Sequence, residues 1–308
     1  MGWRIFFHSQ VLLWLIRKTG YKGEKTVQKR DSSQEIIPDR AFTHGGVFHA
    51  DDVFAAALLR CLNPRIQIER GMKIPKDYPG LVFDIGGGRF DHHQADCRRR
   101  ENGTPYAAFG LLWEAFGEQI LCREDVKKFD REFVQRLDES DNTGAPHELA
   151  AMIHDFNPTW QESMEEQERM FSESVALAVK VLKRRFCHIR AEREAYEQVR
   201  ARLLEQPGQI LFLERALPWK EAVAGTEVLY VIYPSLRGGY SIQAVPVCVG
   251  SMELKKPFPW NWRGKRREEL AALTGIPTFG FCHQSGFLCA ADTKEDAEKV
   301  AAMAAKLQ

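Results

Sequence analysis

The chain has 308 residues, which at roughly 150 residues per domain predicts two domains, each large enough to bury its own core. Hydrophobic residues make up 44% and charged residues 28%, a balance typical of folded globular proteins that excludes a disordered chain and a multi-span membrane protein. Forty-three Lys and Arg against 42 Asp and Glu leave a formal charge of +1, so any binding of a polyanion depends on local patches.

Residues 1–38 differ in composition from the rest of the chain. An apolar stretch from Val11 to Ile16 is too short to span a bilayer, and basic residues follow it. We interpret residues 1–38 as a loosely ordered extension and expect a cytoplasmic protein with no membrane partner. A mitochondrial or other targeting role for this segment is the alternative. The seven cysteines show no CxxC spacing, which indicates free thiols in a reducing compartment.

Residues 39–206 predict a first domain. Short apolar strands alternate there with amphipathic helices, as in an α/β sheet with crossover helices. The predicted strands are 41–43, 66–69 and 81–84, and the predicted helices are 52–62, 105–116, 124–137 and 161–205. The helix over 105–116 is expected to begin with Thr104 as its cap and Pro105 as its first residue.

Residues 207–308 predict a second, smaller α/β domain. Gln206-Pro207-Gly208 ends the long helix, and the chain then becomes rich in strand patterns. The predicted strands are 210–213, 228–233, 240–247, 278–282 and 287–290. A helix from about Thr293, with a face of small apolar residues, closes the domain.

Histidines and aspartates gather at predicted strand ends within the first 100 residues. The set consists of His44, His49, Asp51, Asp84, His92 and His93. Because parallel strands end at the same edge of a sheet, these side chains are expected to meet there. Such a set suits two divalent cations that share one carboxylate, for which Asp84 is the candidate. Nitrogen and oxygen ligands without thiolate favour Mn²⁺, with Mg²⁺, Co²⁺ or Zn²⁺ as alternatives.

The order of these motifs resembles the DHH phosphoesterase superfamily. It runs through His44, His49-x-Asp51, Asp84, Asp91-His92-His93 and Asp138-x-x-Asp141-Asn142. A narrower similarity, to the melanocyte-proliferating-gene family, extends from about Phe42 to the C-terminus. It is carried by the segments Thr43–Asp51, Asp91–Gln94, Ile242–Pro246, Trp262–Gly264 and His283–Phe287.

The resemblance implies a DHH-type parallel-sheet catalytic domain with a helical extension, followed by a C-terminal substrate-binding domain. It implies that the metal ligands are His44, His49, Asp51, Asp84, His92 and Asp141. His93 would contact the phosphate and act with Asp84 in catalysis. Asp138 competes with Asp141 for the last ligand position, because residues three apart share a helix face; the alternative for Asp138 is a solvated carboxylate at a helix end.

The sequence departs from these families at two places. His49 stands where the superfamily commonly has Asp, and Ala107–Gly110 stands where the closer family has Ser-Ser-Ala-Gly. The segment between carries three arginines, of which Arg99 and Arg100 are candidates for binding phosphate because guanidinium matches phosphate geometry. A solvated loop is the alternative.

The second domain offers candidates for substrate recognition. The segment Lys255–Arg267 has six cations, three aromatic residues and no acid, a combination that binds a phosphate backbone and stacks bases. The alternative is that its aromatic residues pack the domain. By resemblance, substrate-binding residues of this domain would be Gly238, Gly239, Arg263, His283, Ser285 and Gly286, which would hold a terminal phosphate across an interdomain cleft.

The residue cluster predicts a two-metal phosphoesterase that works through an activated water. The resemblance implies that it is a 3′-5′ exonuclease acting on single-stranded RNA or short oligonucleotides. One alternative is a hydrolase of a small phosphate compound such as pyrophosphate or a cyclic dinucleotide. Another is a metal-binding regulatory protein without catalysis. A homodimer is an open expectation.

Overall fold

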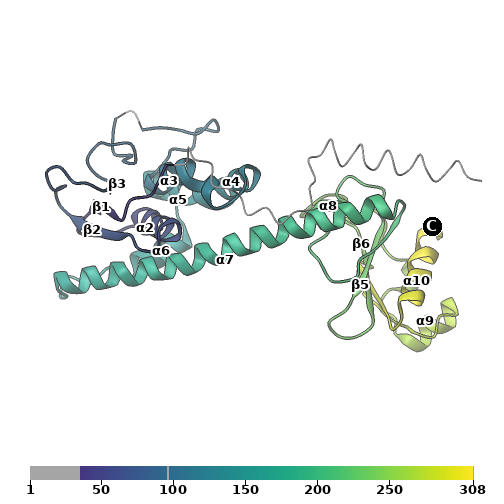
Figure 1. Ribbon diagram of the computed structural model, residues 1–308. Coiled ribbons are helices and arrows are strands. Elements are labelled where there is room, and N and C mark those ends of the chain that lie inside the picture. The colour runs from purple at the N-terminus through teal and green to yellow at the C-terminus, as the bar shows by residue number, and fades with distance from the viewer. Residues whose placement is uncertain (1–34, 96, 308) are drawn as a thin grey trace, which may run out of the picture.

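The computed structural model describes residues 35–95 and 97–307 (Figure 1). The loosely ordered extension expected over residues 1–38 therefore lies almost entirely outside the described residues. Two sheets make up the α/β architecture, one parallel and one mixed, and this confirms the expected fold class at that level. Within the described segments, no helix is both long enough and apolar enough to cross a membrane.

The first sheet is parallel and has the order β2-β1-β3. Its strands are β1 (Arg40–His44), β2 (Gln67–Gly71) and β3 (Leu81–Val82), at the predicted places within one or two residues. Helix α2 (Ala50–Leu62) connects β1 to β2 and buries an almost unbroken apolar run from Val53 to Leu59. This helix is apolar on all sides because helices from later in the chain, labelled α3, α5, α6 and α7 in Figure 1, also pack against it.

A group of helices follows β3. It consists of α3 (Ala108–Phe116), the 3₁₀ turn η1 (Gly117–Gln119), α4 (Arg123–Phe129), the π-helical turn η2 (Asp130–Val134), α5 (Gln135–Thr143) and α6 (Glu148–His154). The predicted start of α3 at Pro105 is wrong, because Pro105 pairs with Arg99 in an antiparallel bridge. The helix predicted over 124–137 continues to Thr143 and stops at Gly144, whose φ of +71° is the left-handed conformation of a helix C-cap.

Helix α7 (Met164–Glu205) runs from the first sheet to the second (Figure 1). Ser163 caps it by accepting a hydrogen bond from the backbone N–H of Glu166. Its apolar residues Phe171, Val175, Ala178 and Leu182 are buried in the first core. Val199, near its end, packs instead with the strands of the second sheet. One helix thus contributes to both cores, and a division of the chain after residue 206 stays a prediction.

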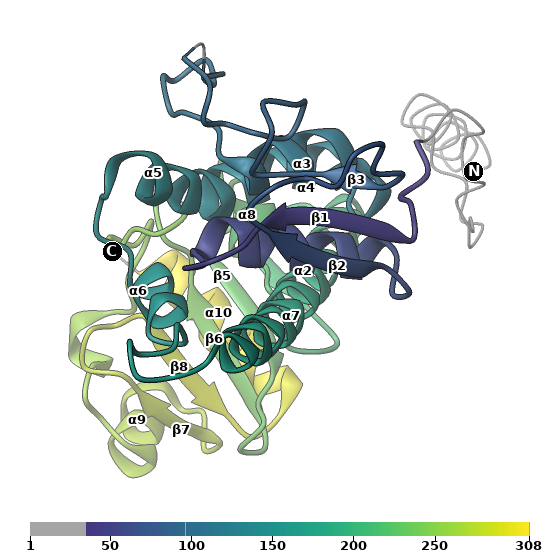
Figure 2. The ribbon, with the colours of Figure 1, turned by 90° about the vertical axis from the view of Figure 1, so that its left-hand side faces the viewer.

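The second sheet has the order β4-β5-β6-β8-β7, with β4 and β5 parallel and the other pairs antiparallel. Its elements are β4 (Ile210–Phe212), α8 (Lys220–Val223), β5 (Tyr230–Pro234), β6 (Tyr240–Ala244), η3 (Trp260–Trp262), α9 (Arg267–Thr274), β7 (Phe279–Cys282), β8 (Leu288–Ala291) and α10 (Lys294–Lys306). Helix α10 begins after Thr293 as expected, and its small apolar face is buried. Figure 2 views the molecule along α7, with the two sheets on different sides of that helix.

Candidate metal centre

The centre lies where the chain leaves the parallel strands at their carboxyl ends. His44 is the last residue of β1, and Asp84 follows two residues after β3. Asp84 has a φ of +56°, a left-handed conformation that costs a residue with a side chain on the order of 1 kcal/mol. The loop that holds it is fixed by backbone hydrogen bonds, among them one from the Asp84 N–H to the Phe90 carbonyl at 2.9 Å. Strain of this kind is typical of functional positions.

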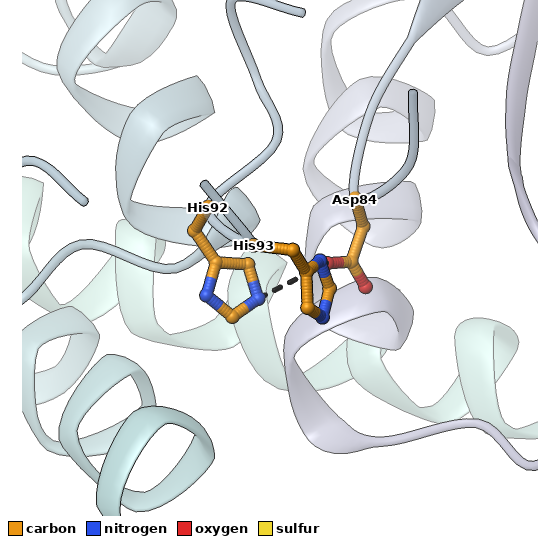
Figure 3. Close-up of side chains that lie close together, drawn as sticks. All are labelled: Asp84, His92 and His93. Carbon is orange, nitrogen blue, oxygen red and sulfur yellow. Dashed lines mark ion pairs between the residues drawn. The ribbon is translucent and has the colours of Figure 1, made fainter. Parts of the chain in front are cut away.

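Asp84 stands between two groups of ligand atoms and faces each with a different oxygen. Its Oδ2 lies 3.3 Å from His44 Nε2, which is also 3.3 Å from Asp52 Oδ2. Its Oδ1 lies 3.1 Å from His92 Nε2 and 3.6 Å from His93 Nδ1 (Figure 3). A carboxylate placed in this way has the arrangement expected of a bridging ligand.

Asp51 and Asp141 lie beside His92 in the second group. Each of these three residues has one ligand atom within 4.8 Å of a ligand atom of the other two. Asp141 Oδ2 is 3.2 Å from His92 Nε2. The Asp51 carboxylate also accepts hydrogen bonds from the N–H groups of Ala108 and Phe109, at 2.9 and 2.8 Å. It thereby caps α3 from a distant part of the chain.

The buried carboxylates of the two ligand groups need positive charge nearby to be stable in their ionised form. Burial raises the pKa of Asp52 to about 7, and burial together with the charges of Asp84 and Asp141 raises the pKa of Asp51 well above its usual range. Asp52 Oδ2 and Asp84 Oδ1 are buried and accept no hydrogen bond from the described residues. Buried carboxylates are stable only when paired or bound to metal. Imidazole nitrogen and carboxylate oxygen are ligands that Mn²⁺, Mg²⁺, Co²⁺ or Zn²⁺ accept, so the residues present fit divalent cations.

These pKa shifts predict how the metal-free chain responds to pH. Between the ordinary value of 3.8 and about 7, folded Asp52 keeps a proton that the unfolded chain has released, so the free energy of unfolding falls as pH rises. His44, whose pKa is raised to about 9 chiefly by its hydrogen bond to Asp84, loses its stabilising contribution as pH rises from 6.5 through about 9. Burial lowers the pKa of His147, which opposes this trend only below pH 6.5.

We therefore expect the metal-free chain to lose a few kcal/mol of stability from pH 5 to pH 9, at about 1.4 kcal/mol per pKa unit. Urea unfolding in EDTA at pH 5, 7 and 9 measures this. Mn²⁺ should flatten the dependence, because a cation then replaces the protons. Stability that rises with pH in EDTA would contradict the electrostatic account.

His49 and His93 lie at the rim of the centre. The His49 ring is 6.2 Å from the His44 ring, centroid to centroid, and falls outside the described groups whose ligand atoms come together. His93 is 62% exposed and is held by Asp91, whose Oδ1 is 2.9 Å from His93 Nδ1. Asp91 Oδ2 accepts a hydrogen bond from the Gly87 N–H at 2.6 Å, so this carboxylate fixes the loop rather than joining the cluster.

The sequence reasoning missed Asp52. Its Oδ1 accepts the His49 N–H at 2.9 Å, as an acidic residue in the first turn of a helix commonly does, and this leaves Oδ2 facing His44. The doublet Asp51-Asp52 at a helix start was the available signal. Adjacent helical residues usually point in different directions, and here Asp52 joins the group with His44 while Asp51 joins the group with His92.

The structure gives Asp138 and Arg100 a shared role that neither was expected to have. Asp138 is fully buried and pairs with the Arg100 guanidinium at 2.7 Å, so its carboxylate faces a cation of the protein itself. Arg100 also binds Asp130 at 2.7 Å and donates to the Pro105 carbonyl. The Arg100 guanidinium, which was expected to bind a phosphate, therefore donates its hydrogen bonds to groups of the protein itself. Neither the metal-ligand nor the solvated interpretation of Asp138 matches this placement.

The Ala107–Gly110 segment contributes through its backbone. Besides the two N–H groups that bind Asp51, the Gly110 N–H donates to Asp138 at 3.1 Å, and a Cβ at Gly110 would collide with that carboxylate. A segment that acts through main-chain donors tolerates the loss of side-chain hydroxyls. The departure from Ser-Ser-Ala-Gly therefore has a local physical explanation.

A pocket of about 690 Å³ opens beside the second group of ligand atoms. His92, His93 and Asp141 line one side, and the exposed Arg99 and His49 lie at its edge. Helix α6 contributes Ala150, Ala151 and His154. All of its lining residues come from the part of the chain between positions 49 and 154, and none from the second sheet.

The substrate-binding residues expected in the C-terminal part fall into two separate places. Gly238 and Gly239 form the β5–β6 turn, next to the pair Tyr240 and Ala291. His283, Ser285 and Gly286 form the β7–β8 turn, at the other end of β8. The two turns therefore lie at opposite ends of β8, and a role of their residues in substrate binding stays a prediction. Arg263 does lie with the second turn, since a Cβ on Gly286 would come within 2.6 Å of its Nε.

The basic and aromatic segment Lys255–Arg267 is mostly structural, as its packing alternative proposed. Phe258 and Trp262 are buried, and Trp260 alone of its aromatic residues is exposed, at 76%. Five of its six cations donate to protein acceptors: Lys255 to the Thr226 carbonyl, Lys256 to the Ala305 carbonyl, Arg263 to the Phe258 carbonyl, Lys265 to Glu269 and Arg267 to Asp292. A continuous track for a phosphate backbone is not formed here.

Fold and site together define an α/β protein with a candidate divalent-metal centre at the carboxyl ends of a parallel sheet. The chain belongs to the MYG1 family, since the family model described as "Uncharacterised protein family (UPF0160)" matches residues 40–305. A relative from Homo sapiens named MYG1 exonuclease is 30% identical, with 89% of this chain and 87% of the relative covered.

Two relatives from distant organisms are similar over comparable spans. A MYG1 protein from Chlamydia trachomatis is 28% identical, with 88% of this chain and 98% of the relative covered. A MYG1 protein from Dictyostelium discoideum is 25% identical, with 83% and 93% covered. The names of the mammalian relatives indicate a hydrolytic, nuclease-type activity in this family.

Proposed function

We propose that this protein is a divalent-metal-dependent phosphoesterase that acts as a 3′-5′ exonuclease on single-stranded RNA or short oligonucleotides. The observation that supports it best is the pair of ligand groups that share Asp84 beside an open pocket. The exonuclease name of several relatives supports the nucleic-acid substrate. The order of the metal-site motifs supports membership of the DHH superfamily and a catalytic unit over residues 39–206.

The side chains divide into two sets by their placement. His44, Asp52 and Asp84 would hold one cation, and Asp51, His92, Asp141 and the second Asp84 oxygen would hold another. Mn²⁺ is the first candidate. When bound, such cations supply an activated water and stabilise negative charge on phosphate oxygens.

The residues of the pocket supply binding and orientation. His93 stands at the rim with Nδ1 toward Asp91, and its other ring nitrogen, Nε2, is proposed to meet a phosphate oxygen. Arg99 adds a guanidinium at the same edge, although one of its amino groups donates to the Gly103 carbonyl at 3.0 Å. His49 is exposed at the opening and is proposed as an accessory ligand.

A recognition surface in the C-terminal part is a further element of the proposal. Trp260 lies under the guanidinium of Arg263, 5.2 Å from its carbon to the ring centroid, beside the turn with His283 and Ser285. An exposed indole next to a cation is suited to stacking on a base. We keep cytoplasmic location and a homodimer as expectations about the same protein.

The test is hydrolysis of a 5′-labelled single-stranded RNA ladder in Mn²⁺, alongside pyrophosphate and a cyclic dinucleotide. Wild-type protein is expected to shorten the labelled RNA progressively, because removal from the 3′ end keeps the label on each product. His92→Ala should abolish this shortening because His92 belongs to the second group of ligand atoms. EDTA should abolish it as well, because EDTA removes the divalent cations.

The other outcomes are equally informative. Immediate release of a labelled mononucleotide would show that digestion starts at the 5′ end instead. Turnover of pyrophosphate or the cyclic dinucleotide alone would establish a small-phosphate hydrolase, for which the self-contained pocket is the supporting observation. Mn²⁺ binding without any turnover would favour a regulatory metal-binding protein.

A further inference from the structure

Asn142 is the last residue of the motif Asp138-x-x-Asp141-Asn142, and the resemblance assigns it no role. It lies in the last turn of α5, directly after Asp141. Both ends of its side-chain amide are engaged. Nδ2 is 2.9 Å from the carbonyl oxygen of Asp138 and 3.1 Å from that of Tyr106, while Oδ1 is 3.2 Å from His92 Nδ1.

These contacts determine which way the amide faces. Two backbone carbonyls can only accept, so the NH₂ end must point at Asp138 and Tyr106. The oxygen then faces His92 Nδ1 at 3.2 Å and, more distantly, the Cys97 thiol at 3.9 Å. An amide oxygen is itself only an acceptor, so the hydrogen bond exists only if His92 Nδ1 carries a proton.

A neutral imidazole protonated on Nδ1 has its lone pair on Nε2. That nitrogen lies 3.1 Å from Asp84 Oδ1 and 3.2 Å from Asp141 Oδ2, inside the carboxylate cluster. A metal-binding histidine commonly donates its other N–H to an acceptor that fixes its tautomer and ring orientation. The contacts of Asn142 have the form of such an acceptor.

We infer that Asn142 is a positioning residue that holds His92 in its Nδ1–H tautomer and thereby aims Nε2 at a divalent cation. The inference rests on the metal-dependent part of the proposed function. In this inference the amide oxygen of Asn142 has the functional role. The NH₂ group orients that oxygen and donates to the carbonyls of Asp138 and Tyr106.

The test compares Asn142→Ala with Asn142→Asp, using Mn²⁺ affinity by titration calorimetry as the first readout. Asn142→Ala removes the acceptor and should weaken Mn²⁺ binding about 10- to 100-fold. Asn142→Asp keeps an oxygen for His92 but has no NH₂ for the carbonyls, and its Mn²⁺ affinity should stay within a few-fold of wild type. Thr143→Ala, on the next pocket-lining residue, is the matched control and should bind Mn²⁺ normally.

An equal loss of Mn²⁺ affinity in Asn142→Asp and Asn142→Ala would show that the NH₂ donors matter and would overturn the inference. The added charge of aspartate is controlled by Thr143→Asp in the Asn142→Ala background, which brings charge without the acceptor. Restoration of affinity by that variant would likewise overturn the inference.

A second readout is independent of metal and of any activity. The ¹⁵N shifts of the His92 ring in metal-free protein, at an alkaline pH where the ring is neutral, report the tautomer. Wild type and Asn142→Asp should show Nδ1–H, and Asn142→Ala should gain Nε2–H. A wild-type ring with its proton on Nε2 would refute the inference even if the protein hydrolyses RNA. An Nδ1–H ring in a protein without turnover would support it while the proposed function fails.

Discussion

Replacing Asp84 by asparagine is expected to lower the proposed RNA hydrolysis by more than about 100-fold, beyond the 10- to 100-fold typical of residues that only orient metal ligands. The reason is that, among the described residues, Asp84 alone presents an oxygen to each group of ligand atoms. Mn²⁺ affinity measured by calorimetry should fall together with turnover.

The same substitution should leave the metal-free chain folded, with a free energy of unfolding within about 1 kcal/mol of wild type. The neutral amide would lose the charge that attracts His44 and His92, but it would also relieve repulsion with Asp51 and Asp52. Asparagine tolerates a φ of +56° better than alanine does, so it is the sharper substitution.

Asp77 offers a matched control for the Asp84 variant. It has a φ of +55°, is exposed and lies outside the metal cluster. Asp77→Asn makes the same chemical change in the same backbone conformation, and it should leave both turnover and Mn²⁺ affinity unchanged. Near-normal turnover in Asp84→Asn, or equal losses in both variants, would contradict the bridging role.

Replacing Arg100 by alanine is expected to destabilise the protein by about 3 to 5 kcal/mol, the usual result of removing one partner from a buried ion pair. Arg100 is 9% exposed, and its loss would leave the fully buried Asp138 and the nearby Asp130 without their cation. Urea unfolding at neutral pH measures the change.

The neighbouring residue makes the comparison decisive. Arg99→Ala should leave the free energy of unfolding within about 0.5 kcal/mol, because Arg99 is exposed, but it should raise the KM for RNA. The double variant Arg100→Ala/Asp138→Asn should recover part of the lost stability, since no uncompensated charge then remains at position 138. Normal stability with a raised KM in Arg100→Ala would restore the original substrate-binding interpretation.

The fold class, most element positions and the proximity of most candidate metal ligands could be predicted from the order of the amino acids. Hydrophobic periodicity predicted all three parallel strands and helix α7 closely, because these elements bury apolar residues at regular spacing. His44 and Asp84 were identifiable because polar residues at the carboxyl ends of adjacent parallel strands must meet at one sheet edge. His92 lies ten residues beyond β3 and was identified by the order of the motifs.

Roles that depend on partners far away in the chain became visible only in the folded molecule. The start of α3 at Ala108 depends on the carboxylate of Asp51, 57 residues earlier, and no local pattern reports such a cap. The sequence predicts Arg100 as a phosphate-binding cation or as part of a solvated loop, yet Asp130 and Asp138 enclose it in the fold. The order of residues determines which chemical groups a protein has, whereas pairing and burial determine which of them remain free to act on a ligand.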